Sequence, residues 1–356
     1  MNRREMIAGL AGTGAWPLAA RAQHDSGVHR IGYLALTSAS FHKPYGDAFR
    51  RGLQELGYIE GKNLEIEARY ADGDTDRLPG LVAELVDLNV VLVTYATGVA
   101  VAQRATSTIP IVMASQGDAV ASGLVASLAR PGGNVTGSTF FNPQLMAKRV
   151  ELLKEAVPSL SRAGVLLMEG SQVNGPILAE MALRAKALAL ELQTFEMGTP
   201  QELTTFFRTW ADNQIGGLVV ADHGILLLNI AAIVSLAAKH RIPSVGPVEL
   251  ARSNGLLAYG VDFFDQFHRA AVFVDKIFKG AKAGDIPIEQ STKFITLANM
   301  KMAKALGIEL PTSILLRADE VIECDDAISS RCSPARQRGR SRRARKTRRS
   351  CAGLLY

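Results

Sequence analysis

The feature that most constrains the fold of this chain is a repeated alternation of short apolar runs with amphipathic segments. Residues 31–36, 90–95 and 109–114 are apolar runs of strand length. Such runs are typical of parallel strands that are buried on both faces of a sheet. Between them, residues 45–56 carry apolar side chains at helical spacing, and Gly57 ends that segment. The pattern predicts an α/β fold built on parallel sheets.

The same alternation begins again in the second half of the chain. Helices are expected at residues 146–156, 177–192 and 226–239, with strands at 162–168 and 218–221 between them. A short helix is also expected at 120–128. Two successive arrays of about 120 residues predict two lobes rather than one sheet, and a chain of 356 residues is long enough for both.

The first 22 residues have the composition of an export signal. Arg3 and Arg4 precede an apolar stretch at 6–20, and Ala20-Arg21-Ala22 is a small-x-small cleavage pattern. The paired arginines resemble a twin-arginine signal, although its usual polar residue and Phe are missing. The alternative is a membrane anchor, but the stretch is shorter than the roughly 20 residues needed to span a bilayer. Residues 1–22 are therefore predicted to direct the chain to the periplasm.

The opposite end, residues 324–356, is an Arg- and Ser-rich tail. Apolar residues are scarce there, so we expect this tail to be disordered. Clustered arginines suit a nucleic-acid-binding arm, but a solvated or aberrant end explains them as well. Between Gln23 and Cys324 there are 27 basic and 31 acidic residues, a net charge of −4, so the pI of 9.3 comes from the termini. No nucleic-acid partner is predicted.

Motifs for catalysis, cofactors and metals are missing from the sequence. The three cysteines are Cys324, Cys332 and Cys351, which leaves the body of the chain without a disulfide, a thiolate zinc site or a cysteine nucleophile. No two of the six histidines are spaced at i+3 or i+4, as a metal-binding helix requires. No metal and no cofactor are predicted. Asp222 and His223 are the best acid/base couple for an enzyme, although the pair can equally line a pocket rim.

Polar loops follow the predicted strands, and in parallel sheets ligands bind outside the carboxyl ends of the strands. Hydroxyls and helix N-termini in the first half can hydrogen-bond a carboxylate, while carboxylates in the second half can bind an ammonium group. We therefore expect a zwitterionic solute, although a short peptide, nucleoside or sugar would fit similar loops. Asp262 is preferred over Asp222 as the cation's partner, and Asp285 is expected outside the cleft. The predicted ligand-binding residues are Thr37, Ser38, Ser40, Thr94, Tyr95, Thr97, Ser115, Asp118, Glu169, Ser171, Asp222, His223, Tyr259 and Asp262.

Several blocks of the sequence resemble one known family. These are residues 16–23 (WPLAARAQ), residues 123–137 (GLVASLARPGGNVTG) after Gly117-Asp118, and residues 293–322, which contain AKALG and RADEVI. The chain is similar over residues 1–323 to the substrate-binding proteins of ABC transporters that include tryptophan- and tyrosine-type receptors. Because members tend to end near residue 323, the resemblance also marks the tail as extraneous.

This resemblance implies a type I periplasmic-binding-protein fold, in which two Rossmann-like lobes with parallel sheets are joined by three crossovers. The crossovers are expected near 140–141, 262–263 and 285–288, so that lobe 1 is 29–139 plus 263–284 and lobe 2 is 140–262 plus 285–323. The resemblance further implies capture of a small-molecule solute by hinge closure, docking on a membrane permease, and no chemical step. The alternatives are an enzyme that uses Asp222 and His223 and the sensing half of a transcription regulator, which would need a helix-turn-helix before the first strand.

Overall fold

The computed structural model describes residues 27–323 of the chain. The predictions for the export signal (1–22) and for the Arg-rich tail (324–356) with its three cysteines lie outside the described residues. Within residues 27–323, no helix has both the length and the apolar character needed to cross a membrane.

The first sheet has six strands, all of them parallel. Alternate residues of β1 point to opposite faces, so Ile31, Tyr33 and Ala35 join one apolar cluster and Leu34 joins another. The strands, in spatial order, are β2 (Leu64–Tyr70), β1 (His29–Ala35), β3 (Val91–Tyr95), β4 (Ile111–Gly117), β5 (Val135–Phe140) and β11 (Glu289–Gln290).

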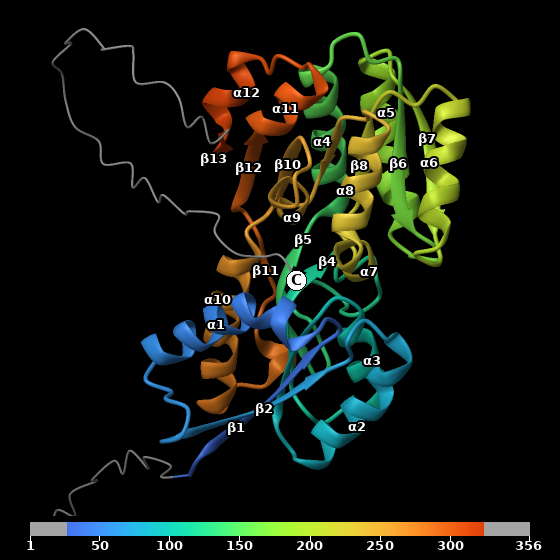
Figure 1. Cartoon of the computed structure of the whole chain (residues 1–356). Coiled ribbons are helices and arrows are strands. Elements are labelled where there is room, and N and C mark those ends of the chain that lie inside the picture. The colour runs from blue at the N-terminus through green and yellow to red at the C-terminus, as the bar shows by residue number, and fades with distance from the viewer. Residues whose placement is uncertain (1–26, 324–356) are drawn as a thin grey trace, which may run out of the picture. The chain divides into compact units, whose positions relative to one another are not determined.

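Helices cover both faces of this sheet. Helices α1 (Ala39–Glu55) and α10 (Phe263–Phe278) pack side by side on one face, and α2 (Leu78–Asp87) and α3 (Thr97–Ala105) pack on the other (Figure 1). Two short 3₁₀ turns, η1 (Thr75–Arg77) and η2 (Ala283–Asp285), complete this lobe.

The second sheet has seven strands, and β12 is antiparallel to β10 whereas the other neighbours are parallel. Its core is the largest apolar cluster of the described residues and includes the fully buried Phe207 and Trp210. The strands, in spatial order, are β7 (Glu191–Met197), β6 (Arg162–Met168), β8 (Leu218–Val220), β9 (Ser244–Gly246), β10 (Leu257–Val261), β12 (Phe294–Asn299) and β13 (Glu320–Ile322). The helices are α4 (Asn142–Ala156), α5 (Asn174–Ala187), α6 (Glu202–Asp212), α7 (Gly224–Leu228), α8 (Ile230–Lys239), α9 (Val248–Arg252), α11 (Met300–Leu306) and α12 (Thr312–Arg317).

Both sheets have the same strand order. In each, the second strand in sequence lies on one side of the first strand, at the edge of the sheet, and the third, fourth and fifth follow on its other side. In the first sheet this order is β2-β1-β3-β4-β5, and in the second it is β7-β6-β8-β9-β10. The connections therefore leave in opposite directions at β1/β3 and at β6/β8, and such switch points are where doubly wound folds bind ligands. The predicted fold class, two α/β lobes with mostly parallel sheets, is confirmed.

The chain passes between the two sheets three times within the described residues. Two passages come after β5 and after β10. The third was expected at 285–288 but lies at 291–293, because β11 pairs with β5 in the first sheet. The Thr136 hydroxyl also donates to the Ile286 carbonyl (2.9 Å), which holds the preceding residues in lobe 1. Below, lobe 1 denotes residues 27–140 and 263–290, and lobe 2 denotes residues 141–262 and 294–322.

Two helices expected from the sequence differ in the structure. Residues 120–128 form turns instead of a helix, because Asp118 and Gly123 have positive φ and the backbone folds back on itself there. The helix expected at 226–239 is divided into α7 and α8 at Asn229, whose side-chain amide donates to the Ile225 carbonyl at 2.8 Å.

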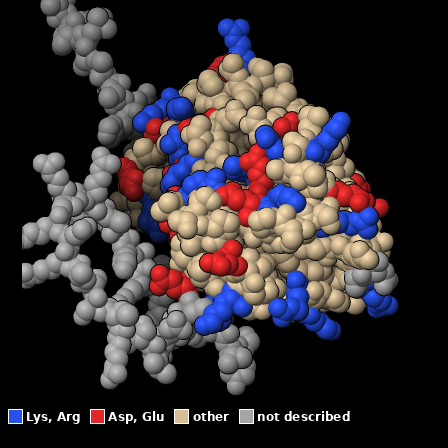
Figure 2. All heavy atoms as spheres, turned by 90° about the horizontal axis from the view of Figure 1, so that it is seen from above, with Lys and Arg blue, Asp and Glu red and all other residues tan. Residues whose placement is uncertain are grey.

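Charged side chains of both signs are mixed over the face of the described chain shown in Figure 2. In lobe 2, Arg184 lies 2.8 Å from Glu151, and Arg162 lies 2.8 Å from Glu191. Exposed pairs such as these contribute only about 0–1 kcal/mol each. Their arrangement leaves basic charge dispersed on this face rather than gathered into a stripe.

Candidate functional site

A cavity of about 400 Å³ lies at the carboxyl ends of strands from both sheets. Lobe 1 contributes residues 95–97 after β3 and 115–117 at the end of β4, and lobe 2 contributes 170–174 after β6 and 221–224 after β8. This is the position expected from the switch points of the two sheets. Six residues named from the sequence line it: Tyr95, Thr97, Ser115, Ser171, Asp222 and His223.

The lobe 1 wall offers hydrogen-bond donors without a basic side chain in its interior. Helix α3 begins at Thr97 in this wall, and the N–H groups of a helix's first turn have no partner within the helix. Gly98 allows the first turn of α3 to lie close to the end of β3, since a Cβ at position 98 would clash with the Thr94 hydroxyl. Ser115 is 4% exposed, and its Oγ has no hydrogen-bond partner among the described residues.

The lobe 2 wall contains Asp222, whose side chain is 3% exposed and is held by a buried arginine. Nη2 of Arg149 donates to Oδ1 of Asp222 at 3.0 Å. Oδ2 lies 2.6 Å from Nη1, but the Nη1 hydrogens point to the Val220 carbonyl and the Met146 sulfur. Oδ2 accepts no hydrogen bond from the described residues, but it lies in a close ion-pair contact with Nη1.

Two further residues add unpartnered acceptors to the cavity. Gln116 and Asn142 both line it, and each has a buried side-chain oxygen without a hydrogen-bond partner among the described residues. Buried polar atoms are rarely left unpaired in folded proteins. Like Asp222, both residues bring side-chain oxygens to the lining of the cavity.

His223 is a neutral helix cap in this structure. Its Nδ1 accepts a hydrogen bond from the Ile225 N–H (3.3 Å) at the start of α7. Burial lowers the pKa of His223 to about 4, so the ring carries no charge at neutral pH. Asp222 faces Arg149, and no hydrogen bond joins it to His223. The geometry of a coupled acid and base, on which the enzyme alternative depends, is not formed by these two residues.

A small aromatic annex of about 40 Å³ adjoins the cavity and shares Tyr95 and Ser115 with it. His42 stacks on Tyr95 with ring centres 4.9 Å apart. Its two nitrogens lie within hydrogen-bonding distance of the Thr37 hydroxyl (3.2 Å) and the Tyr33 hydroxyl (2.8 Å). Burial lowers the pKa of His42 to about 3, so this ring is also neutral. Thr37, predicted from the sequence, belongs to the annex.

One hydrogen bond between two side chains joins the two lobes within residues 27–323. The hydroxyl of Tyr45 in α1 donates to Oε1 of Glu249 in α9 at 2.6 Å. Burial is the main cause that raises the pKa of Glu249 above its ordinary value, and the nearby Asp222 adds to it. Tyr45 also lines the annex, so this contact closes the annex at the boundary between the lobes.

Six residues named from the sequence lie away from both spaces. Ser38 caps α1 through the Phe41 N–H, and Ser40 is exposed beside it. Thr94 is buried and donates to the Leu34 carbonyl at 3.0 Å. The remaining three are Asp118, which accepts from the Ala121 N–H, Glu169, which is exposed, and Tyr259, which stacks on Phe294.

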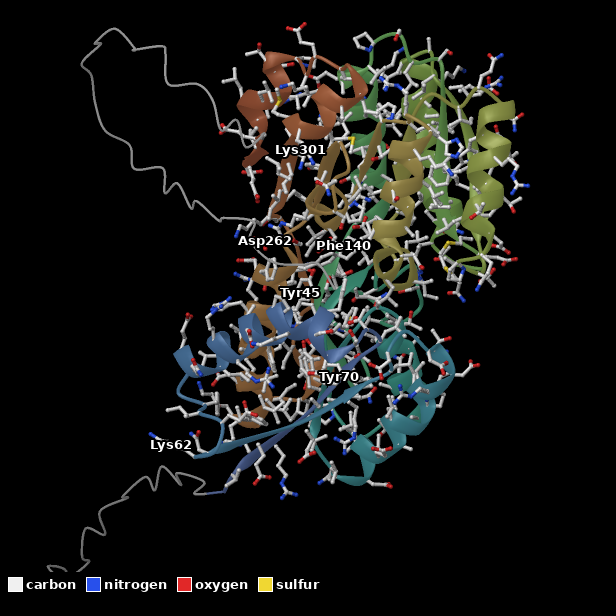
Figure 3. The ribbon with its side chains drawn as sticks, in the orientation of Figure 1. Tyr45, Lys62, Tyr70, Phe140, Asp262 and Lys301 are labelled. Atoms are coloured by element: carbon white, nitrogen blue, oxygen red, sulfur yellow. The ribbon has the colours of Figure 1, made fainter. Side chains whose placement is uncertain are left out.

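Asp262, the residue preferred from the sequence as the cation's partner, also lies outside the lining of the cavity. Its Oδ1 accepts from the Asp265 N–H at 3.0 Å, which caps α10, and its Oδ2 lies 2.7 Å from Nζ of Lys293. Figure 3 shows Asp262 where the chain passes between the sheets, with Phe140 and Tyr45 near it and Lys62 and Lys301 far from it. The carboxylate of Asp262 is already paired on both oxygens.

Arg149 was missed from the sequence, although a signal for it exists. It lies on the apolar face of α4, among Met146, Val150 and Leu153, and is fully buried. An arginine on the apolar face of a helix must be paired. Gln116 and Asn142 carry no comparable signal, since amides are common in loops and at helix starts. Within residues 27–323, no group of three His, Cys, Asp or Glu side chains is placed to hold a metal ion.

Comparisons with known proteins agree on one family. The family model for ABC transporter substrate binding proteins matches residues 39–322. A tyrosine-binding protein of Clostridioides difficile (strain R20291) is 28% identical over 267 residues, which are 73% of this chain and 76% of that protein. The structure of an ABC domain from Streptococcus pneumonia in complex with L-Trp is 25% identical, with a TM-score of 0.76, and the match covers 83% of this chain and 99% of that one. A ligand-free, open substrate binding protein from Clostridium difficile is 22% identical with the same coverage and a TM-score of 0.62.

Proposed function

Because the chain belongs to the family of ABC transporter substrate-binding proteins, we propose that it captures an amino acid with an aromatic side chain between its lobes. The family predicted from the sequence blocks is confirmed, and the fold is that of the type I periplasmic binding proteins. The observation that carries the proposal is a cavity with helix N–H donors in one wall and the buried carboxylate of Asp222 in the other.

The carboxylate of the amino acid binds the lobe 1 wall. The N-terminus of α3 at Thr97 presents backbone N–H groups and the positive end of the helix dipole, which favour an anion. The free Ser115 hydroxyl supplies a further donor. Arg104, an exposed residue at the rim of the same wall, attracts the carboxylate from solvent.

The ammonium group binds the lobe 2 wall, where Asp222 replaces Asp262 as its partner. An ammonium group has three N–H donors, and Asp222 is the carboxylate among the residues that line the cavity. Gln116 and Asn142, which also line it, each have a buried side-chain oxygen without a hydrogen-bond partner among the described residues.

The side chain packs against the aromatic part of the cavity. Tyr95, Phe140 and Phe263 line it, and the rings of Phe140 and Phe263 meet edge to face with centres 6.1 Å apart. Aromatic rings prefer this environment. The names of the C. difficile relative and of the S. pneumonia complex, which refer to tyrosine and L-Trp, support the same class of solute.

Closure of the lobes on the solute turns binding into a signal. A solute that touches both walls stabilises the arrangement in which the lobes meet, and that arrangement docks on a membrane permease. No chemical step takes part. We propose an extracytoplasmic location, reached by cleavage of residues 1–22, since an importer's receptor meets its solute outside the cytoplasm.

Thermal shift measurements of the purified chain against the common amino acids test the proposal. L-tryptophan and L-tyrosine should raise the melting temperature in a concentration-dependent way, and isothermal titration should give one site per chain. D-glucose and uridine serve as controls for the sugar and nucleoside alternatives. Absence of a shift with every amino acid would refute the proposal, and recovery of a chemically altered solute would favour an enzyme instead.

A further inference from the structure

Arg149 lies beneath the cavity wall, where it pairs with the one carboxylate among the cavity-lining residues. Its side chain is fully buried, and the Asp222 side chain above it is 3% exposed. Neither residue contacts bulk water to any useful extent, so each depends on the other for charge balance. The only other charged residue in the lining is Arg104, which is exposed at the rim.

The guanidinium is fixed by contacts on all of its nitrogens. Nε donates to the Tyr259 carbonyl at 2.7 Å, Nη1 donates to the Val220 carbonyl at 2.9 Å, and Nη2 donates to Oδ1 of Asp222 at 3.0 Å. These acceptors lie on β10, on β8 and just after β8, and Arg149 itself lies on α4. A planar group with donors in fixed directions, held from three elements, gives Asp222 one orientation toward the cavity.

The same contacts decide the net charge that a solute meets. The charges of Asp222 and Arg149 sum to zero, so an ammonium group beside Asp222 is attracted by the carboxylate and repelled by the guanidinium behind it. A solute that has a carboxylate but no ammonium group is repelled less by Asp222 than it would be by an unpaired anion, because Arg149 offsets the charge of Asp222. Within a low-dielectric interior both effects are larger than at the surface.

We propose that Arg149 is a positioning residue that sets the charge selectivity of the cavity. Arg149 orients Asp222 toward the ammonium group and offsets part of the negative charge of Asp222. The cavity should therefore bind L-tyrosine most tightly, the carboxylate 3-(4-hydroxyphenyl)propionate less tightly and the amine tyramine least tightly. The inference rests on the proposed function, since it assigns Asp222 to the same amino-acid site.

The test compares the dissociation constants of these three compounds by isothermal titration, with displacement at millimolar concentration for the weaker ones. The deciding quantity is the ratio of the tyramine constant to the propionate constant. Arg149→Met exposes an uncompensated carboxylate to the solute, so this ratio should fall about tenfold or more. Asp222→Asn leaves the guanidinium without its carboxylate, so the ratio should rise by a similar factor. The double variant should return it to near the wild-type ratio.

Two controls separate charge selectivity from damage to the fold. Arg149→Lys keeps the charge and should keep the ratio near its wild-type value even if all three affinities fall. Arg162→Met removes an arginine from the surface of the same lobe, where it pairs with Glu191, and should change nothing. If Arg149→Met does not fold, Asp222→Asn alone still predicts a shift of defined sign.

The outcomes distinguish this inference from the function on which it rests. Equal weakening of all three compounds in both variants would show that Arg149 only supports the fold, which overturns the inference. So would a wild-type protein that binds tyramine at least as tightly as the propionate. A wild-type protein that binds neither L-tryptophan nor any of the three compounds would refute the proposed function instead.

Discussion

Replacement of Asp262 by alanine should reduce stability while leaving solute affinity within about threefold of wild type, a difference below 1 kcal/mol. Asp262 accepts the capping hydrogen bond from the Asp265 N–H at 3.0 Å. Loss of such an N-cap costs about 1 kcal/mol. Asp262 also pairs with Lys293 at 2.7 Å, and the Asp262 carboxylate is the main cause that raises the pKa of Lys293.

The ion pair adds little to this cost, because the Lys293 side chain is 59% exposed. An exposed pair is worth about 0–1 kcal/mol, so the whole loss in the free energy of unfolding should be about 1–2 kcal/mol. Asp262→Asn is the matched control, since Asn also caps helices well. It should retain the cap, lose the ion pair and cost less than about 1 kcal/mol.

Urea denaturation and isothermal titration with L-tyrosine on the same preparations measure both quantities. Asp285→Ala, an exposed residue of η2 in lobe 1, should change neither. The reasoning would be refuted if Asp262→Ala lost a hundredfold or more in affinity with an unchanged free energy of unfolding. Asp262 would then hold the solute's cation, as expected from the sequence alone.

Four further changes test other parts of the structure. Burial lowers the pKa of His42 from an ordinary 6.5 to about 3, so below about pH 6.5 the unfolded state binds more protons than the folded state. The free energy of unfolding should therefore fall as pH drops below about 6.5. Urea titrations at several pH values should show a smaller fall for His42→Gln. Burial raises the pKa of Glu249 while the lobes meet, so solute affinity should be greatest below the ordinary Glu pKa and should decline as pH rises through the raised value. Glu249→Gln should flatten this pH dependence. An affinity that rises with pH would contradict the prediction. Tyr45→Phe removes the hydrogen bond between the lobes and should weaken binding about threefold to thirtyfold, measured by titration. Gly137→Ala should cost at least ~3 kcal/mol in a thermal melt, because Gly137 has φ of 129° and a Cβ would meet the Met113 backbone.

The sequence by itself determined the class of fold and the end of each sheet at which the cavity lies. Apolar runs of strand length alternating with amphipathic helices leave parallel sheets as the solution, and carboxyl-end loops follow from strand direction. Tyr95, Thr97, Ser115 and Asp222 were reached in this way and do line the cavity. Local patterns suffice for these conclusions because the burial of one face of a helix or strand repeats with the period of that element.

Only the tertiary structure decided which polar side chains face the cavity and which are already paired. Asp222 and Asp262 both follow strands of the second sheet, and nothing in their local sequence separates a carboxylate that caps a helix from one that faces a ligand. The structure separates them by place and partner: Asp222 lines the cavity and pairs with Arg149, 73 positions before it, whereas Asp262 lies outside the lining and pairs with Asp265 and Lys293. The periodicity of a sequence predicts which face of an element is buried, but not which distant residue packs against that face. The chemistry of a site depends on these distant partners.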